Sequence, residues 1–399
     1  MLFWGETKVL PDGTLLYVMT VSSPDDGSRI QVSKMLPNGQ MDNGFGTGGH
    51  ALFSIGVGDY GFSLTIQPDG KVIIAGATSP SASLFQSDFL VFRLNPNGTL
   101  DKSFAENGLF IRDFVPAKSK EFSNDIAGSV RLLPDGKMIV AGYSDRYESL
   151  GRASSFATLV RLDPDGVIDT GFGSNGITQT HLGSNHTNGG YGFDRTDAFL
   201  KSDGKILIGI TVERPDSDSP NSYTPHALIV RYNENGSLDN TFAGNGVLAV
   251  QPGKFSFLTD MEITLDDKML VCIGYLIARY DSEGELDMSF GEKGYVGAPN
   301  SLWRLLDIYL TRDQKILVSA SENIPLQPSG ETQGGGILRL RQDGSRDLRF
   351  GRGGIVRADF GEIMIGFGSI GIYENAIFVS GGYGIPGGRF MVAKYFYGK

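Results

Sequence analysis

RLDPDGVIDTGFGSNG, residues 161–176, is the stretch that decides the fold of this chain. Taken alone, it allows two chemical interpretations. Its three aspartates resemble the ligands of a calcium loop, and its last three glycines spell G-x-G-x-x-G, the pattern of a dinucleotide-binding turn. The choice between these interpretations and a structural one depends on which residues the copies of this stretch share.

The stretch is one copy of a repeat. Six copies occur, and in chain order they are KMLPNGQMDNGFGTGG (34–49), RLNPNGTLDKSFAENG (93–108), RLDPDGVIDTGFGSNG (161–176), RYNENGSLDNTFAGNG (231–246), RYDSEGELDMSFGEKG (279–294) and RLRQDGSRDLRFGRGG (339–354). A second motif alternates with it, and its copies are LPDGTLLYV (10–18), QPDGKVIIAG (67–76), LPDGKMIVAG (133–142), KSDGKILIGI (201–210), LDDKMLVCIG (265–274), TRDQKILVSA (311–320) and YENAIFVSG (373–381). The copies recur at intervals of roughly sixty residues, which is typical of solenoids, propellers and other repeat architectures.

The repeat unit predicts β-structure. A P-D-G turn runs directly into an apolar, β-branched segment such as KVIIAG at 71–76, and no part of the chain has a sustained helical period. Each unit supplies four short strands: one before the P-D-G turn, one after it, one that ends in Arg or Lys, and one after F-G-x-x-G. Four strands in each of seven units predict an all-β chain that forms a single seven-bladed β-propeller with four-stranded antiparallel blades.

The number of strands also predicts their order within a blade. The strand after F-G-x-x-G occurs six times and the others seven times. A missing outermost strand leaves only a short edge, whereas a missing innermost strand would leave a hole. We therefore expect this strand outermost, one blade without it, and the strand before P-D-G innermost. The alternative that residues 1–8 complete the last blade stays open. The expected units of the single domain, residues 1–399, are approximately 1–57, 58–115, 116–182, 183–252, 253–299, 300–361 and 362–399.

The alternation of P-D-G-K-I-x-x-x-G with R-L-x-x-x-G-x-x-D-x-x-F-G-x-x-G resembles the bacterial delta-60 repeat family, and the resemblance covers nearly the whole chain. It implies a propeller fold and no defined activity. The family is often associated with secreted or surface proteins, and the resemblance extends that association to this chain.

The copies decide the question that the stretch 161–176 raises. Its first aspartate, Asp163, corresponds to residues that include Leu36 and Arg341, which cannot serve as calcium ligands. Every copy keeps an aspartate, a phenylalanine three residues later and a basic residue eight residues earlier. The aspartates are Asp42, Asp101, Asp169, Asp239, Asp287 and Asp347, and the basic residues are Lys34, Arg93, Arg161, Arg231, Arg279 and Arg339. We expect a repeated ion pair across the turn, with the phenylalanine buried beneath it. Strand sequences, rather than a helix, follow G-x-G-x-x-G, which excludes the dinucleotide interpretation.

Composition limits the class of partner. Hydrophobic residues make up 40% of the chain and charged residues 20%, as in an ordinary globular protein, and the 56 glycines indicate many turns. The net charge of −10 argues against nucleic acid and anionic membranes as partners. The single cysteine, Cys272, lies in an apolar run and is expected to be a buried thiol. No standard signal peptide and no transmembrane segment are recognised. Cytoplasmic residence and export by another route both stay open.

One face of the predicted propeller is the candidate binding face. The P-D-G and N-G turns share one face and are short, while the loops on the other face are long and variable, which is where binding residues usually lie on a rigid scaffold. The candidate ligand-binding residues of these loops are Tyr143, Tyr147, His186, Tyr191, Phe193, Asp194, Arg195, Tyr223 and His226, with Phe85 and Phe156 as further loop aromatics. Aromatic side chains among polar neighbours favour a glycan or a protein surface as the ligand. The alternative is that these aromatics pack down and order the loops.

A second constellation lies at the axis. Six residues before the turn aspartate, the innermost strands carry Glu6, Ser63, Ser129, Asp197, Asp260, Asp307 and Gly368. We expect Asp197, Asp260 and Asp307, from three neighbouring blades, to form an acidic mouth of the central channel. Each aspartate either accepts backbone N–H bonds and holds its own loop, or contributes to a polyol, amine or metal site. No cofactor is expected, although a divalent cation at this mouth stays open.

Three functions remain in order of preference. The first is a non-catalytic binding module that binds a glycan or protein surface through the variable loops. The second is an enzyme with an acidic, metal-assisted site at the channel mouth, and the third is a structural scaffold or toxin component. No G-x-S-x-G or H-E-x-x-H motif occurs, and His181 and His186 have no well-placed partners for a zinc site. Nucleophile–base geometry cannot be inferred, since blades meet in space rather than in sequence.

Overall fold

The structure is a computed structural model that describes residues 2–23, 27–80, 86–115, 122–147, 152–186, 196–216, 219–250, 256–300, 303–322, 335–358, 364–383 and 389–396. Within these ranges every regular element is a β-strand, apart from one short 3-10 helix, η1 (Phe242–Gly244). In the same ranges no helix is long and apolar enough to cross a membrane. The expectation of an all-β chain is therefore confirmed for the described part of the protein.

The strands form six separate antiparallel sheets. The first comprises β1 (Leu2–Val9), β2 (Leu15–Ser23), β3 (Gly27–Met35), β4 (His50–Phe53), β5 (Gly58–Ile66), β6 (Val72–Ser79), β7 (Asp88–Leu94) and β8 (Leu109–Arg112). The next two comprise β9 (Phe122–Leu132), β10 (Met138–Tyr147), β11 (Arg152–Leu162) and β12 (Ile177–His186), and β13 (Asp197–Leu200), β14 (Ile206–Asp216), β15 (Ser219–Tyr232) and β16 (Val247–Val250). The last three comprise β17 (Leu258–Ile263), β18 (Met269–Ile273), β19 (Leu276–Tyr280) and β20 (Tyr295–Gly297); β21 (Trp303–Leu310), β22 (Ile316–Glu322), β23 (Gly335–Leu340) and β24 (Ile355–Ala358); and β25 (Met364–Tyr373), β26 (Ala376–Tyr383) and β27 (Arg389–Phe396).

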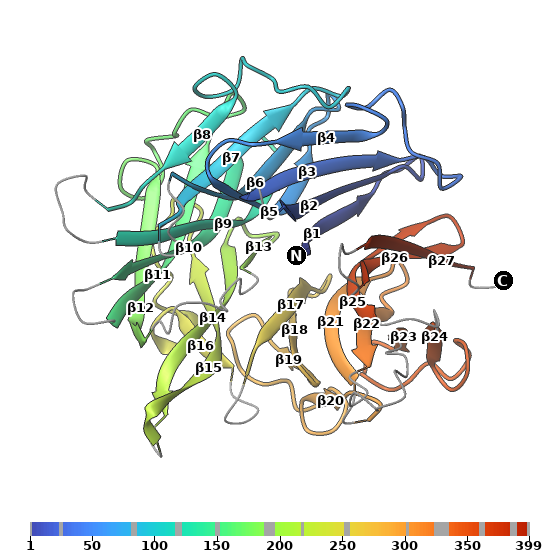
Figure 1. Ribbon diagram of the computed structural model, residues 1–399. Coiled ribbons are helices and arrows are strands. Elements are labelled where there is room, and N and C mark those ends of the chain that lie inside the picture. Colours follow the sequence, from blue (N-terminus) through green and yellow to red (C-terminus); the bar gives the residue numbers. More distant parts are fainter. Residues whose placement is uncertain are drawn as a thin grey trace.

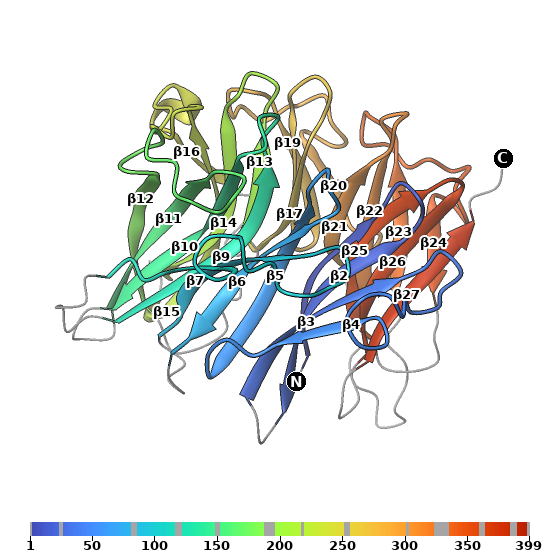
Figure 2. The same cartoon turned by 90° about the horizontal axis from the view of Figure 1, so that it is seen from above.

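The first sheet consists of two antiparallel groups, β1–β4 and β5–β8, joined only by the parallel pairing of Ser28 with Gly58. Strand groups follow one another around a central region, next to which β1 lies (Figure 1), and their strands run between two faces of the molecule (Figure 2). The strands after F-G-x-x-G (β4, β8, β12, β16, β20 and β24) lie at one edge of their groups, as expected, and the last group has only three strands. Because β1 pairs with β2, the alternative that residues 1–8 complete the last group is wrong.

The core lies between successive groups rather than within one. Apolar side chains of β6 and β7, such as Ile73 and Val91, form one buried cluster with Val130 of β9 and Val140 of β10. Each sheet thus buries one face against the sheet before it and the other against the sheet after it. The continuous apolar runs that follow the P-D-G turns are explained by this arrangement, since β6 is buried along its whole length.

The expected ion pair is present in all six copies of the repeat. Its nitrogen–oxygen distances are 2.9 Å for Lys34–Asp42, 2.8 Å for Arg93–Asp101, 2.8 Å for Arg161–Asp169, 2.7 Å for Arg231–Asp239, 2.9 Å for Arg279–Asp287 and 2.9 Å for Arg339–Asp347. In the five copies that have arginine, the guanidinium lies 4.4–4.9 Å from the ring centroid of the phenylalanine three residues after the aspartate. These phenylalanines are buried, as expected. The motif is therefore a packed unit of cation, carboxylate and aromatic ring.

The same arginine also reaches the next copy along the chain. Arg93 Nη1 donates to the Pro164 carbonyl at 2.7 Å, and Arg161 Nη1 donates to the Glu234 carbonyl at 3.1 Å. Beside these bonds, backbone N–H groups of the F-G-x-x-G loop donate to the next N-G turn, as Gly173 does to Asn235 at 2.8 Å. The stretch 161–176 therefore joins neighbouring groups of strands, and Asp163 Oδ1 accepts backbone N–H bonds within its own turn.

These ion pairs differ in burial, which predicts unequal contributions to stability. The side chains of Arg231 and Asp239 are 2% and 5% exposed, whereas those of Lys34 and Asp42 are 26% and 23% exposed. Burial would raise the pKa of Asp239, but hydrogen bonds from Lys205 and Thr241 and the charge of Arg231 outweigh it and hold the pKa below its usual value. We expect Asp239→Ala to lower the free energy of unfolding by about 3–5 kcal/mol, since it leaves a buried guanidinium without its carboxylate.

The matched variant Asp42→Ala removes the same interaction at the surface and should cost about 0–1 kcal/mol. Urea unfolding of both variants, followed by tryptophan fluorescence, measures the difference. Equal losses from Asp239→Ala and Asp42→Ala would contradict the assignment of a structural role to the buried pairs.

Candidate functional site at the axis

The innermost strands share a β-bulge that aims one side chain toward the neighbouring group. In β5, β9, β17, β21 and β25 one extra residue interrupts the pairing, and these residues are Phe62, Gly128, Thr259, Leu306 and Gly368. The partner strand approaches closely at this point. A Cβ on Gly76 would lie 2.0 Å from the carbonyl oxygen of Tyr60, which explains the glycine that ends KVIIAG. Bulges commonly re-aim a side chain in this way.

The residue after the bulge accepts a backbone N–H bond from the next innermost strand. The bonds are Leu64 N to Glu6 Oε2 (3.1 Å), Val130 N to Ser63 Oγ (3.3 Å), Ala198 N to Ser129 Oγ (3.3 Å), Ile308 N to Asp260 Oδ2 (2.6 Å), Ile370 N to Asp307 Oδ2 (2.8 Å) and Thr7 N to Ser369 Oγ (3.4 Å). Five of these six acceptors are predicted axial residues; the sixth is Ser369, and the predicted Asp197 accepts instead from the Arg131 side chain. The sequence left two roles open for these residues: holding a backbone loop or binding a ligand. The six acceptors do bind backbone N–H groups, but these groups belong to the next strand rather than to the residue's own loop.

The exception is the last member of the series. The sequence alignment placed Gly368 there, but the structure places Ser369 at this position. Ser369 pairs with Ser380, whereas Gly368 is the bulged residue. The reason is the turn between β25 and β26, in which only Glu374 and Asn375 separate the paired residues Tyr373 and Ala376. Elsewhere five residues separate the pair, as between Ile66 and Val72, so counting back from the turn gives the wrong residue.

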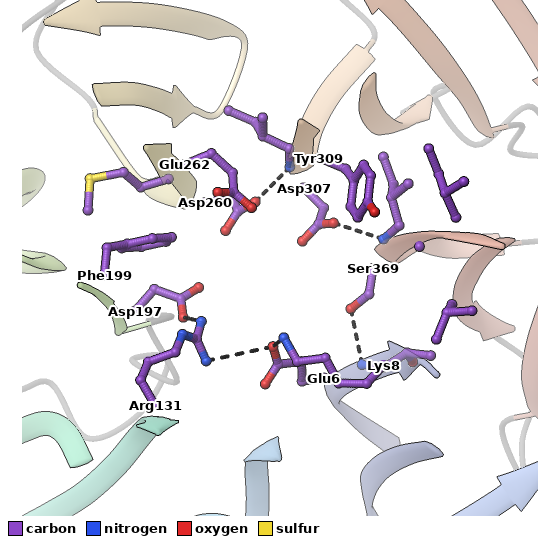
Figure 3. A pocket seen from close by; sticks show the side chains of 17 residues that line it. Glu6, Lys8, Arg131, Asp197, Phe199, Asp260, Glu262, Asp307, Tyr309 and Ser369 are labelled. Atoms are coloured by element: carbon purple, nitrogen blue, oxygen red, sulfur yellow. Dashed lines mark hydrogen bonds and ion pairs between the residues drawn. The ribbon is translucent and has the colours of Figure 1, made fainter. Parts of the chain in front are cut away.

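Five of the axial residues, Glu6, Asp197, Asp260, Asp307 and Ser369, line a cavity of about 180 Å³. Its charged side chains come from five different strands and divide between two sides (Figure 3). Glu6, Lys8 and Arg131 lie on one side, and Asp260, Glu262 and Asp307 lie on the other with Tyr309 beside Asp307. Asp197 and Phe199 lie between the two sides. Asp197, Asp260 and Asp307 are all among the residues that line this cavity.

The basic groups of the cavity are paired with carboxylates. Arg131 Nη2 donates to Asp197 Oδ1 at 2.7 Å, and Arg131 Nη1 lies 3.8 Å from Glu6 Oε1. Lys8 forms an ion pair with the same Glu6. Burial would raise the pKa of Glu6, but the charges of Lys8 and Arg131, with a hydrogen bond from Ser63, lower it to about 2. This side of the cavity is therefore a rigid, charge-balanced network.

The opposite side is acidic. Glu262 projects into the cavity two residues after Asp260, and burial, reinforced by the charge of Asp307, raises its pKa to about 7. Sequence analysis did not identify Glu262, Lys8 or Arg131. All three lie two residues beyond a predicted axial residue, which in a strand places them on the same face. This period of two was the signal available, but the equivalent positions hold unlike residues such as Phe199 and Tyr309.

No three histidine, cysteine or acidic side chains among the described residues are arranged to hold a metal ion. Glu6, Asp260 and Asp307 instead accept backbone N–H groups of neighbouring strands, and Asp197 pairs with Arg131. The residues present in the described part of the cavity therefore fit a divalent cation poorly.

The loop-face predictions fall into two sets. Five of the loop residues lie outside the described residues, namely Phe85, Tyr191, Phe193, Asp194 and Arg195. His186 in β12 and Tyr223 in β15 belong to described strands, but their side chains lie outside the described part. Among the others, Tyr147 ends β10 and is partly buried, while His226 Nε2 lies 3.0 Å from Thr224 Oγ1 in β15. Burial, together with the charge of Arg214, lowers the pKa of His226.

The prediction that Tyr143 lies in a binding loop is wrong. The sequence places it in an exposed loop, but it lies within β10, is only 6% exposed and belongs to a hydrophobic cluster. The hairpin of β10 and β11 extends to Tyr147 and Arg152, so residues expected in a loop are paired strand residues. Tyr143 therefore contributes to packing rather than to an exposed binding surface.

The extended hairpin carries an aromatic cluster that is partly exposed. The guanidinium of Arg146 lies 4.4 Å from the ring centroid of Phe156, and the ring of His181, on the outermost strand β12, lies 5.1 Å from the same centroid. Arg146 Nη2 also donates to Gln179 Oε1 at 2.6 Å. Nearby, burial raises the pKa of Asp145 to about 6. We call Arg146, Phe156, Gln179 and His181 the hairpin cluster.

Comparison with known proteins supports the propeller assignment. A family model described as "Domain of unknown function (DUF5122) beta-propeller" matches residues 67–104, 133–172 and 217–242, which together are less than half of the chain. No curated protein matches the sequence.

Solved structures that resemble the chain include proteins of several activities. A protein of unknown function from Bacteroides caccae has a TM-score of 0.43 and 11% identity, and the match covers 86% of this chain and 98% of that one. The Penicillium chrysogenum alpha-L-arabinanase has a TM-score of 0.43 and 13% identity, covering 80% and 88%. The polysaccharide lyase Uly1 has a TM-score of 0.45 and 11% identity, covering 98% and 90%. These likenesses carry no conclusion about the activity of this chain.

The axial hydrogen bonds predict that an acceptor, rather than a charge, is required after the bulge. Asp260→Ala leaves the buried Ile308 N–H without its acceptor and should lower the free energy of unfolding by about 1–3 kcal/mol. Asp260→Asn keeps a carbonyl oxygen at this position and should cost less. Thermal unfolding of both variants at neutral pH provides the measurement, and an equal or larger loss in Asp260→Asn would show that the charge matters more than the bond.

The raised pKa of Glu262 predicts a pH-dependent stability. Because its pKa in the folded state, about 7, exceeds the usual value of 4.5, folding favours the protonated form. This contribution is complete below about pH 4.5 and is lost as the pH rises through about 7. Glu262→Gln resembles the protonated form, so it should match the wild type near pH 5 and be more stable by roughly 1–3 kcal/mol near pH 8.

Urea unfolding at the two pH values measures this difference. Glu285→Gln, at an exposed position in the same strand group, is the matched control and should change stability equally at both. A Glu262→Gln protein with no gain at the higher pH would indicate that Glu262 is ionised at neutral pH in the folded protein.

Proposed function

We propose that this member of a β-propeller family is a non-catalytic binding module, a single domain of seven blades of which the last lacks its outermost strand. Its ligand is a glycan or a protein surface, bound on the face that carries the long loops and the mouth of the axial cavity. Most of these loops lie outside the described residues. The proposal is supported by the strand groups, by the chemistry of the cavity and by the hairpin cluster.

The blade number is supported by contact between the first and last groups. Leu15 of β2 packs against Ala376 and Phe378 of β26 in one buried cluster. Ser380 Oγ donates to Thr7 Oγ1 at 2.7 Å, next to the bond from Thr7 N to Ser369 Oγ. Seven antiparallel groups that meet around an axis in this way are consistent with a ring held by packing and hydrogen bonds rather than by a shared strand.

One observation carries the preference for binding over catalysis: the axial carboxylates already have structural partners. Glu6, Asp260 and Asp307 each hold a backbone N–H of the next strand. The described cavity lining contains no histidine or cysteine, and its one serine, Ser369, accepts the N–H of Thr7. Groups held in this way make a fixed polar surface, which suits recognition more than proton transfer.

The hairpin cluster supports a glycan among the possible ligands. The ring of Phe156 contacts both the guanidinium of Arg146 and the ring of His181, and His181 is exposed. A rigid aromatic group next to the amide of Gln179 offers both stacking and hydrogen bonding. The remaining loop candidates, namely Tyr147, His186, Tyr191, Phe193, Asp194, Arg195, Tyr223 and His226, stay predictions for the same face.

An enzyme is the second candidate, because Glu262 has a carboxyl group whose pKa of about 7 suits a general acid or base. It lies on the same side of the cavity as Asp260 and Asp307 (Figure 3). The metal-assisted form of this alternative has no support in the described residues. The third alternative, a structural scaffold or toxin component, predicts no specific ligand.

A glycan array with the purified protein, with and without chelator, tests the proposal. We expect selective binding that the chelator does not abolish. His181→Ala should weaken this binding by up to about tenfold, since stacking on an aromatic ring contributes about 0.5–1.5 kcal/mol. His50→Ala, which changes a histidine on the outermost strand of another group, is the matched control and should bind as the wild type does.

Loss of binding with the chelator would instead favour a metal at the axis. A blank array would remove glycans and leave a protein surface as the ligand. Turnover of an array glycan, abolished by Glu262→Gln, would replace the binding module with the enzyme.

A further inference from the structure

We propose that the axial cavity binds a protonated primary amine of about monosaccharide size, with the ammonium group against Asp260, Glu262 and Asp307. This inference rests on the proposed binding function and names a ligand class for one part of that site. It is carried by the size of the cavity, the separation of charge within it, the position of Glu262 and the two aromatic side chains in its wall.

The volume limits the size of the ligand. A cavity of about 180 Å³ corresponds to roughly six water molecules, each of which occupies about 30 Å³ in the liquid. A six-membered ring with a few polar substituents fits this space, whereas an oligosaccharide or a peptide loop does not. A longer ligand would therefore place only one terminal group in the cavity.

The distribution of charge selects a cation. Arg131 and Lys8 are already neutralised by Glu6 and Asp197, at distances that leave little positive potential for an anionic ligand. On the opposite side, Asp260, Glu262 and Asp307 come from the adjacent strands β17 and β21. A cation placed there would lie in the combined negative potential of these carboxyl groups in a partly desolvated site, where such interactions are stronger than in water.

Glu262 is the carboxyl group whose position indicates ligand binding rather than a role in holding the strands together. Asp260 and Asp307 each use Oδ2 to hold a neighbouring strand, whereas Glu262 has no hydrogen bond or ion pair with any of the described residues. Its side chain is partly buried and faces the cavity (Figure 3). A partly buried carboxyl group without a partner is costly unless something else satisfies it. An ammonium group beside it would supply both a donor and the opposite charge.

The walls also suit an organic cation better than a metal ion. Phe199 and Tyr309 lie on β13 and β21 and line the cavity next to the acidic side. Aromatic faces attract ammonium groups, and they stack on the apolar face of a saturated ring. Metal coordination would require several carboxylates at short range, and no such group occurs among the described residues.

Binding of a cation should be linked to release of a proton. Burial raises the pKa of Glu262 most; of the charged groups that face it, Asp307 and Asp197 raise the pKa further, and Arg131 and Lys8 lower it. With a pKa of about 7, the carboxyl group of Glu262 is partly protonated near pH 7 when the cavity holds no cation. An ammonium ligand favours the ionised form, so the proton leaves on binding and the affinity rises with pH through about 7.

Titration calorimetry with trans-4-aminocyclohexanol tests the inference, with trans-1,4-cyclohexanediol as its neutral counterpart. An alkylammonium such as that of lysine has a pKa of about 10.4, so the probe stays charged from about pH 5.5 to about pH 8. We expect the amine to bind at least about tenfold more tightly than the diol, and about tenfold more tightly near pH 8 than near pH 5.5. Titrations near pH 7 in buffers of different ionisation enthalpy should reveal proton release.

The variants Glu262→Gln and Glu285→Gln complete the test. Glu262→Gln should weaken binding of the amine near pH 8 by about tenfold or more and remove both the pH dependence and the proton release. Glu285→Gln should change neither. The thermal unfolding of each variant, measured in parallel, shows whether the protein is folded.

Equal binding of the amine and the diol, or absence of binding by the amine, overturns the inference, as does amine binding that survives Glu262→Gln unchanged. The glycan array separates these failures from failure of the proposed function. Selective array binding without amine binding leaves the binding module standing and removes only the axial amine site. Amine binding with a blank array removes glycans from the proposed function and keeps the axial site.

Discussion

The structure depends on one hydrogen bond repeated at the axis. A side-chain oxygen on one innermost strand accepts the backbone N–H of the next innermost strand, as Glu6 does from Leu64 and Asp307 does from Ile370. Innermost strands of neighbouring sheets are not paired with one another by ladder hydrogen bonds, so each would otherwise bury unsatisfied N–H groups. The bulge before each acceptor is what turns the side chain toward its neighbour.

A second series of contacts holds the sheets together far from the axis. There the arginine of each repeat contacts its own aspartate and phenylalanine and also a carbonyl oxygen of the next repeat, as Arg93 contacts Pro164. This second series acts at the ends of the strands opposite the long loops.

Either a hydroxyl or a carboxylate oxygen can be the acceptor of the axial hydrogen bond. Ser63 and Ser129 serve as well as Asp260 and Asp307. The charge of the axis can therefore change without changing the fold. In this chain the acidic residues lie on adjacent strands and the basic residues lie on the opposite side. The cavity therefore has one acidic side and one charge-balanced side, which a ring of identical residues would not have.

The sequence by itself determined the repeat, the all-β fold and the pairing of Arg161 with Asp169, because each of these depends on residues at constant offsets within one copy. It also identified Asp197, Asp260 and Asp307 as axial, since equivalent positions in a repeat occupy equivalent places. Only the tertiary structure decided which groups meet. Glu262 and Arg131 face one cavity although unlike residues occupy their equivalents, Ser369 replaces Gly368 because one turn is shorter, and Tyr143 is buried because its hairpin extends further. These outcomes depend on register and on contacts between distant strands, which no local pattern encodes.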